Sequence, residues 1–193
     1  MGSYADDALF MSRNNIEYVE LISDDGKSKV MVIPAWQGRV MTTSAAGDEG
    51  DSYGWINYSF IKKRQIDLQF NPVGGEERFW LGPEGGVFSL YFRQGEKQIY
   101  KNWKVPPVLD IEAFKIQSQS KNCICLTKEG CLTNACGTTF YLNIKRTISL
   151  LDINEFAASF NLEFPKDIKA VAYKSDNQIT NIGNESWNKE TGL

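Results

Sequence analysis

The stretch that most constrains the fold runs over residues 71–86 and reads NPVGGEERFWLGPEGG. Five of its sixteen residues are glycine. Because each glycine inside an α-helix costs about 1 kcal/mol relative to alanine, this stretch is not expected to be helical. A Phe-Trp pair at residues 79–80 is more typical of buried than of solvent-exposed chain. We therefore expect an ordered, partly buried loop, followed by a core strand at residues 87–93.

The same loop carries the groups that a sugar site uses. Glu77, Arg78, Trp80 and Glu84 bring two carboxylates, a guanidinium and an indole close together. Charged side chains bond paired hydroxyls with fixed geometry, and an aromatic ring covers the C–H face of a sugar. Glu76 precedes Glu77, but adjacent residues of an extended segment point to opposite sides, so we expect Glu77 to act with Glu84. The competing interpretation is a tight turn with one Glu–Arg ion pair and a core tryptophan.

Composition excludes several classes of function. The 193 residues suffice for one domain, and their net charge of −3 comes without a basic stripe, so we expect no nucleic-acid partner. The chain has no histidine, which excludes imidazole acids, bases and metal ligands and a Ser-His-Asp triad. Phosphate-loop and dinucleotide motifs are absent, so we expect no cofactor. No apolar run is long enough for a membrane span, and the first residues do not resemble a signal peptide.

Hydrophobic alternation and turn residues predict a β-rich chain that opens with a helix and a hairpin. A short helix is expected within residues 3–14, and the hairpin strands at residues 16–22 and 29–35, joined by an Asp-Asp-Gly turn. A third strand follows at residues 40–45. Residues 60–70 have a mixed period that fits either a short helix or an edge strand.

The second half of the chain is typical of an antiparallel meander. Short strands recur there at the spacing of β-sandwiches, with a turn expected at residues 129–130. The expected strands cover residues 113–120, 122–129, 131–137 and 138–151. Asp152 is an expected N-cap for one or two helical turns, and a last strand lies within residues 168–182.

Four cysteines fall within fourteen residues, at positions 123, 125, 131 and 136. Their spacing lacks the C-x₂-C knuckles of zinc sites and lies in strand sequence. Three interpretations follow: buried free thiols, one cross-strand disulfide, or a bound metal. We favour buried free thiols and expect no metal, because Cys123 and Cys125 would share one face of the strand.

Several sequence blocks together resemble one bacterial family. They are VIPAWQGRVMTTSAAGDEGDSYGWINY, GGEERFWLGPEGG with VFSLYF, NW-x-x-P at 102–106, LTN-x-x-G-T-x-F at 132–140 and ITN-x-G-x-x-x-W at 179–187. The family is an uncharacterised one of the galactose mutarotase-like (aldose 1-epimerase-like) superfamily. The resemblance implies an all-β fold with one or two short helices. This is an antiparallel β-supersandwich with a sugar-sized cleft on its concave face.

The resemblance also bears on completeness and assembly. Members of that family are longer, so we expect residues 1–193 to form a single mutarotase-like domain that is incomplete, with its C-terminal half beyond the chain. An unpaired sheet edge would then remain, and such edges recruit further strands. We therefore expect either a longer parent protein or a homodimer. The resemblance favours a bacterial periplasmic or secreted location over the cytoplasm.

The function that the resemblance implies is carbohydrate binding or processing, with a small sugar or an oligosaccharide as partner. Aldose epimerases use a glutamate base and a histidine acid, so without histidine these roles do not carry over and no catalytic residue is assigned. The arginine that orients the sugar has its best counterpart in Arg78 and its second in Arg39. Trp36, Trp55 and Trp103 are expected to complete the site. The alternative function is a non-catalytic structural or assembly module that has the same fold and no sugar ligand.

Overall fold

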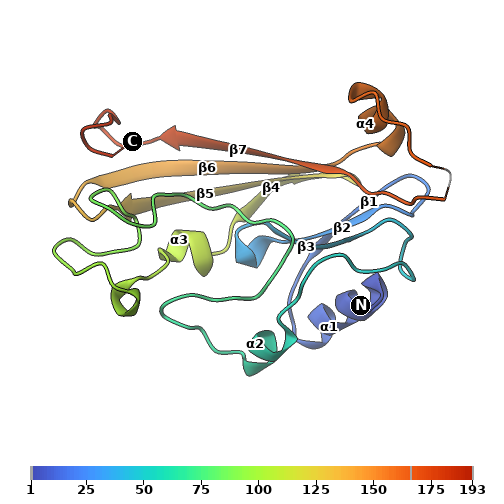
Figure 1. Ribbon diagram of the computed structural model, residues 1–193, viewed down its shortest axis with the longest axis horizontal. Helices are drawn as coiled ribbons and strands as arrows, with labels where there is room; N and C mark the ends of the chain where they lie inside the picture. Colours follow the sequence, from blue (N-terminus) through green and yellow to red (C-terminus); the bar gives the residue numbers. More distant parts are fainter. Residues whose placement is uncertain (1, 166, 193) are drawn as a thin grey trace.

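The computed structural model of the chain describes residues 2–165 and 167–192. It is mainly β, with two antiparallel sheets of three and four strands that share one apolar core, which confirms the expected all-β sandwich class. In Figure 1 the four-stranded sheet lies along one side of the molecule. The three-stranded sheet lies on the other side, together with helices α1 (Tyr4–Arg13) and α2 (Tyr58–Lys63).

The three-stranded sheet is buried on both faces. Its strands, in the order β1-β2-β3, are β1 (Val19–Ile22), β2 (Lys29–Ile33) and β3 (Arg39–Ser44). The β1–β2 pair is the expected hairpin. Alternation along β2 sends Val30 and Val32 toward the four-stranded sheet, and Met31 and Ile33 toward α1.

The four-stranded sheet has one buried face and one solvent face. Its strands, in the order β4-β5-β6-β7, are β4 (Lys115–Gln119), β5 (Cys123–Thr133), β6 (Thr139–Leu150) and β7 (Tyr173–Asn181). Strand β6 buries every second residue from Phe140 to Leu150 against the core. Within residues 2–165 and 167–192, β4 and β7 are the edge strands.

The edge strand β7 leaves its core-side face open. Its register with β6 places five side chains on the same side of the sheet as the buried residues of β6. We call these residues the inner face of β7: Tyr173, Ser175, Asn177, Ile179 and Asn181. Each of them is half-buried or exposed rather than buried. The inner face of β7 is therefore an open margin of the sandwich.

The expected turn at residues 129–130 is wrong. Strand β5 instead pairs with β6 over its whole length, and the chain reverses at residues 134–138. There the Thr138 backbone N–H donates to Asn134 Oδ1 at 2.9 Å, which closes the reversal. Gly130 is explained by packing and not by a turn, because a Cβ there would lie 3.0 Å from the Val108 side chain.

The expected strand at residues 87–93 is also wrong, although Ser89, Tyr91 and Phe92 are buried as a core strand would be. The backbone of this segment bonds three separate parts of the chain instead of one neighbouring strand. Leu90 N–H donates to Pro83 O, Ala135 N–H to Ser89 O and Lys104 N–H to Tyr91 O, at 3.1, 2.8 and 2.9 Å. The apolar side chains of residues 87–93 therefore reflect burial in the core and not pairing in a sheet.

Four short α-helices occur among the described residues, more than the one or two expected. In α1, Ser3 and Asp6 form a capping box, and α2 resolves the ambiguous residues 60–70 in favour of a helix that begins after Asn57. The expected N-cap Asp152 begins the last helix. The remaining elements are α3 (Pro107–Asp110), α4 (Ile153–Ser159) and the 3₁₀ turns η1 (Pro34–Trp36) and η2 (Tyr100–Asn102). None of the helices that the structure describes is long and apolar enough to cross a membrane.

Candidate functional site

Arg146 is the central residue of the candidate site. It lies in the middle of β6 on the core side, and its side chain is fully buried. Its guanidinium donates from Nε to the Gly38 carbonyl at 3.1 Å, from Nη1 to Asn177 Oδ1 at 2.7 Å, and from Nη2 to the Glu77 carboxylate. These partners are needed, because an uncompensated buried charge is strongly destabilising.

Glu77 reaches Arg146 because its backbone is fixed to β3. Val40 N–H donates to the Glu77 carbonyl at 3.1 Å, and Glu76 N–H donates to the Val40 carbonyl at 2.9 Å. The Glu77 side chain remains 27% exposed, and its Oε2 accepts from Arg146. Its Oε1 lies 3.4 Å from the Ser175 hydroxyl. The protein therefore orients the carboxylate of a side chain that is partly exposed to solvent.

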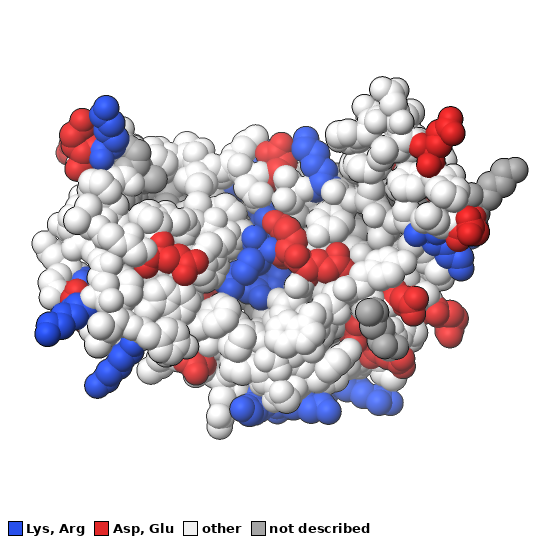
Figure 2. All heavy atoms as spheres, viewed as in Figure 1, with Lys and Arg blue, Asp and Glu red and all other residues white. Residues whose placement is uncertain are grey.

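Polar side chains of the inner face of β7 adjoin this ion pair. Asn177 bonds Arg146, Ser175 bonds Glu77, and Tyr173 lies one step further along the strand. Burial and the nearby carboxylates raise the pKa of Tyr173 to about 12, so its phenol keeps its proton at neutral pH and can donate. Figure 2 shows basic and acidic side chains gathered near the middle of one face of the molecule.

Glu76 is a second carboxylate in a different environment. Its Oε1 accepts from the Thr43 backbone N–H at 2.7 Å and from the Thr43 hydroxyl at 2.9 Å. Burial raises the pKa of Glu76 in spite of these two hydrogen bonds. The two adjacent carboxylates are therefore distinct: Glu77 is paired with a buried guanidinium, whereas Glu76 is bonded to neutral groups.

Arg78, expected to be the main sugar-binding arginine, is engaged inside the protein. Its Nη2 donates to the Leu109 carbonyl at 2.6 Å and lies 3.6 Å from Asp110 Oδ1. Its guanidinium carbon lies 4.0 Å from the centroid of the Trp80 ring, and its side chain is 19% exposed. Asp110 in turn accepts from Asn71. Arg78 therefore ties the glycine-rich loop to α3.

Two of the four tryptophans expected at the site, Trp80 and Trp103, pack against tyrosines in one aromatic cluster. Trp80 lies 5.2 Å from Tyr91, and Tyr91 stacks on Trp103 at 5.4 Å between ring centroids. Tyr100 stacks on Trp103 in the same way at 6.4 Å. Glu84 accepts a hydrogen bond from Trp80 Nε1 at 2.8 Å rather than meeting Glu77 in a common arrangement. We call Trp80, Tyr91, Trp103 and Tyr100 the aromatic ladder. It supports the loop. Glu77 and Glu84 therefore have different partners, Arg146 and Trp80.

The other three predicted residues have three different surroundings. Arg39 is buried and donates from Nη1 to the Gly74 carbonyl at 2.5 Å, and burial together with the nearby Arg78 lowers the pKa of Arg39 to about 10. Trp36 is half-buried at a cavity of about 310 Å³ on the α2 side. Trp55 is 65% exposed. Among the residues predicted from the sequence, Glu77 pairs with Arg146, which was not predicted. Arg78, Trp80 and Glu84 belong to a separate contact network.

A family model matches the chain over residues 2–193, and its description is "Family of unknown function (DUF6786)". The chain belongs to this family. No curated protein and no solved structure matches it. The DUF6786 match spans the glycine-rich loop and both sheets, and hence both members of the Glu77–Arg146 pair. Because its description names no activity, the geometry of this DUF6786 chain carries the functional argument.

Sequence reasoning missed Arg146 and the polar residues of β7. The signal for Arg146 was present: in IKRTI, residues 144, 146 and 148 share one face of a strand, so an arginine stands among core-facing isoleucines. An arginine at such a position requires a buried acceptor. The acceptor is the carboxylate of Glu77, which lies 69 positions away in the sequence. The pattern of a single strand does not predict such a long-range contact.

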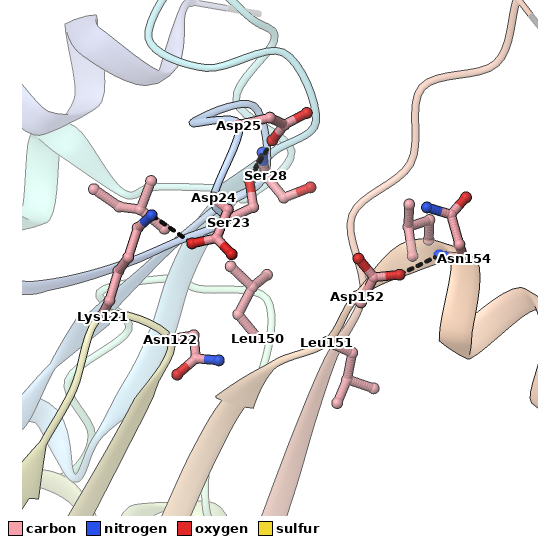
Figure 3. Close-up of a pocket in the computed structure, with 12 residues that line it drawn as sticks. Ser23, Asp24, Asp25, Ser28, Lys121, Asn122, Leu150, Leu151, Asp152 and Asn154 are labelled. Carbon is pink, nitrogen blue, oxygen red and sulfur yellow. Dashed lines mark hydrogen bonds and ion pairs between the residues drawn. The ribbon is translucent and has the colours of Figure 1, made fainter.

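Another polar hollow of this DUF6786 chain, of about 460 Å³, lies where the β1–β2 turn meets α4 (Figure 3). Its three aspartates have local partners. Asp24 pairs with Lys121 at 2.7 Å, Asp25 accepts from Ser23, and Asp152 accepts from the first backbone N–H groups of α4. In the part of the chain that the structure describes, no group of three or more His, Cys, Asp or Glu residues could hold a metal ion.

The four cysteines are all free, so the structure agrees with the favoured interpretation in having no disulfide among them. Its burial component is correct for Cys125, partly correct for the half-buried Cys123, and wrong for Cys131 and Cys136, which are exposed. Cys131 is exposed because it faces solvent toward the end of β5, and Cys136 because it lies in the reversal that follows.

Proposed function

We propose that this DUF6786 chain binds a carbohydrate on the inner face of β7, beside Glu77. The observation that carries the proposal is the partly exposed side chain of Glu77, whose carboxylate is oriented by the buried Arg146 and flanked by Ser175 and Asn177. An oriented carboxylate with neighbouring amide and hydroxyl groups suits the paired hydroxyls of a sugar. The resemblance of several sequence blocks to the galactose mutarotase-like superfamily supports the same class of ligand.

The roles of the side chains follow from their donor and acceptor capacity. Glu77 accepts from ligand hydroxyls, and the Asn177 amide and Ser175 hydroxyl both donate and accept. Tyr173 can donate through its phenol, which is protonated at neutral pH. Binding is better supported than turnover, since no residue is assigned to proton transfer on a substrate.

Calorimetry with a panel of neutral mono- and oligosaccharides tests this function. Asn177→Ala should weaken the binding of the best ligand about threefold to tenfold, as expected for one lost hydrogen bond. The matched control is Gln178→Ala, because residue 178 is the next residue of β7 and points to the opposite face. No binding at millimolar sugar, or equal losses in the two variants, would contradict the proposal.

A specific observation favours the alternative, a structural module without a sugar ligand. Arg78 and Trp80 are engaged with each other and with α3, as a purely structural loop requires. Under this alternative, substitutions at Glu77 and Asn177 change stability and no sugar of the panel binds. The calorimetric panel therefore separates the two functions.

We also propose that the chain forms a homodimer through one of its edge strands. Within the described residues β4 and β7 each have a neighbour on one side, and a second copy could pair with either edge. Sedimentation equilibrium tests this proposal: a concentration-dependent mass approaching twice 21.8 kDa supports pairing, and a constant monomer mass contradicts it.

A further inference from the structure

A further cavity lies at the far end of β7 from Tyr173, against the segment of residues 183–191. Its volume is about 650 Å³. Its walls offer an indole, a phenol, three amides and four further hydroxyls, a set of groups suited to a sugar ring. These groups belong to Trp187, Tyr141, Asn181, Asn184, Asn188, Thr138, Thr139, Ser186 and Thr191. Glu185 is the single charged residue in the lining, so the cavity favours a neutral ligand.

The cavity has fixed walls. Trp187 packs edge-on against Phe140, with ring centroids 6.1 Å apart. Asn181 bonds the segment twice, since its Nδ2 donates to the Glu185 carbonyl at 2.8 Å and its Oδ1 accepts from Gly183 N–H at 2.9 Å. Further along, Asn134 Nδ2 donates to the Thr191 carbonyl at 2.8 Å. The indole of Trp187 and the amide of Asn181 are therefore held in place before any ligand binds.

The inner face of β7 connects this cavity to the Glu77 site. The register sets Asn177 opposite Arg146 and Asn181 opposite Leu142, so both asparagines point to the same side of the sheet. Four residues of strand separate them, which is about 13 Å. Between them lies Ile179, which is 37% exposed. An accessible strip of side chains thus runs from the ion pair to the cavity.

We infer that the ligand is a neutral linear oligosaccharide, with one sugar ring beside Glu77 and another in the cavity against Trp187. This inference rests on the proposed function and specifies its class of ligand. A monosaccharide occupies the end of the strip beside Glu77, whereas an oligosaccharide also contacts Ile179 and the cavity.

The test compares chain lengths. Calorimetry uses the mono-, di-, tetra- and hexasaccharides of the cello-, malto-, xylo- and manno-series with the wild-type chain. Affinity should rise by about tenfold or more from the monosaccharide to the hexasaccharide of the best series, since stacking on an indole and added hydrogen bonds contribute at least that much. Trp187→Ala should remove most of this gain and leave the affinity for the monosaccharide unchanged.

Trp187 also packs on Phe140, so its removal could disturb residues 183–191. Asn184→Ala is the second variant, because residue 184 is exposed in the lining. It should lower the hexasaccharide affinity about threefold and leave the monosaccharide affinity unchanged, as expected for one lost hydrogen bond. Gln178→Ala again serves as control and should change neither.

Two results would overturn the inference while leaving the proposed function in place. One is an affinity that does not depend on chain length, and the other is an equal loss for mono- and hexasaccharides in both cavity variants. A failure of every sugar in the panel would overturn the proposed function together with the inference.

Discussion

The ion pair between Glu77 and Arg146 should show strong energetic coupling. Arg146 is fully buried and Glu77 is 27% exposed, so removing either charge leaves the other without its partner in a poorly solvated place. Breaking a buried pair from one side costs about 3–5 kcal/mol, and the partial exposure of Glu77 places Arg146→Met near the lower end of that range. Glu77→Gln keeps an acceptor for the guanidinium, so its cost should be about 2 kcal/mol.

The double variant decides whether the charges act as a pair. Replacing both members with uncharged residues of similar volume removes the unpaired charge that makes each single variant costly. The double variant should therefore cost about 2 kcal/mol rather than the roughly 5 kcal/mol that adding the singles gives, which is a coupling of about 3 kcal/mol.

Urea unfolding of the four proteins, followed by tryptophan fluorescence and circular dichroism, measures these free energies. Equal slopes of free energy against urea across the set are the control that all four unfold from a comparable state. If the single costs add to within about 0.5 kcal/mol, the two residues are independent and the pair does not organise the site.

Three further predictions concern residues outside that pair. Arg78→Ala should lower the free energy of unfolding by about 2–4 kcal/mol, through loss of its bond to a carbonyl and its contact with Trp80, while sugar affinity changes less than about twofold; a large affinity loss at unchanged stability would return Arg78 to the binding site. Burial raises the pKa of Glu76, so the folded state binds this proton more tightly than the unfolded state, and the contribution of Glu76 to stability falls as pH rises above about 4.3. Glu76→Gln should therefore gain stability relative to wild type between about pH 4 and pH 7, and a difference that shrinks over this range would contradict the assigned environment. A disulfide reagent should react fast with Cys131 and Cys136 in the native protein and with all four thiols only after unfolding, and four fast thiols in the native protein would be inconsistent with this exposure.

Local chemistry made the first part of the fold predictable from the sequence. The opening helix follows from the capping box that begins at Ser3, and the β1–β2 hairpin follows from two alternating segments around an Asp-Asp-Gly turn. The glycine-rich loop was predicted because so many glycines disfavour a helix. The structure adds a positional reason, since Gly74 has a φ of 95° and a Cβ there would lie 2.2 Å from the Trp55 carbonyl oxygen.

The errors arose where tertiary contacts override local pattern. Residues 87–93 form an apolar run typical of a core strand, but their backbone bonds three separate segments, which no local property encodes. Gly130 was interpreted as a turn residue, although it is a small residue that makes room for Val108 within a continuous ladder.

The candidate site was half predictable. Glu77 was identified because carboxylate, guanidinium and indole cluster in one loop, but the cluster suggested that Glu77 acts with Glu84 while Arg78 binds the sugar. In the structure the two residues turn to different neighbours, Glu77 to Arg146 and Arg78 to Trp80 and Leu109. The sequence indicates which residues need partners, and only the packing of the two sheets decides which partners they receive.

The most direct test of carbohydrate binding at Glu77 is a titration followed by the backbone amide resonances of the chain in nitrogen-15 NMR spectra. With the best oligosaccharide of the panel, the account predicts saturable shifts for amides in residues 74–77 and 173–181. The Glu77→Gln protein should need a higher sugar concentration to reach the same shifts. Shifts confined to other parts of the chain, such as residues 97–104, would contradict the account. The absence of shifts at millimolar sugar would contradict it as well.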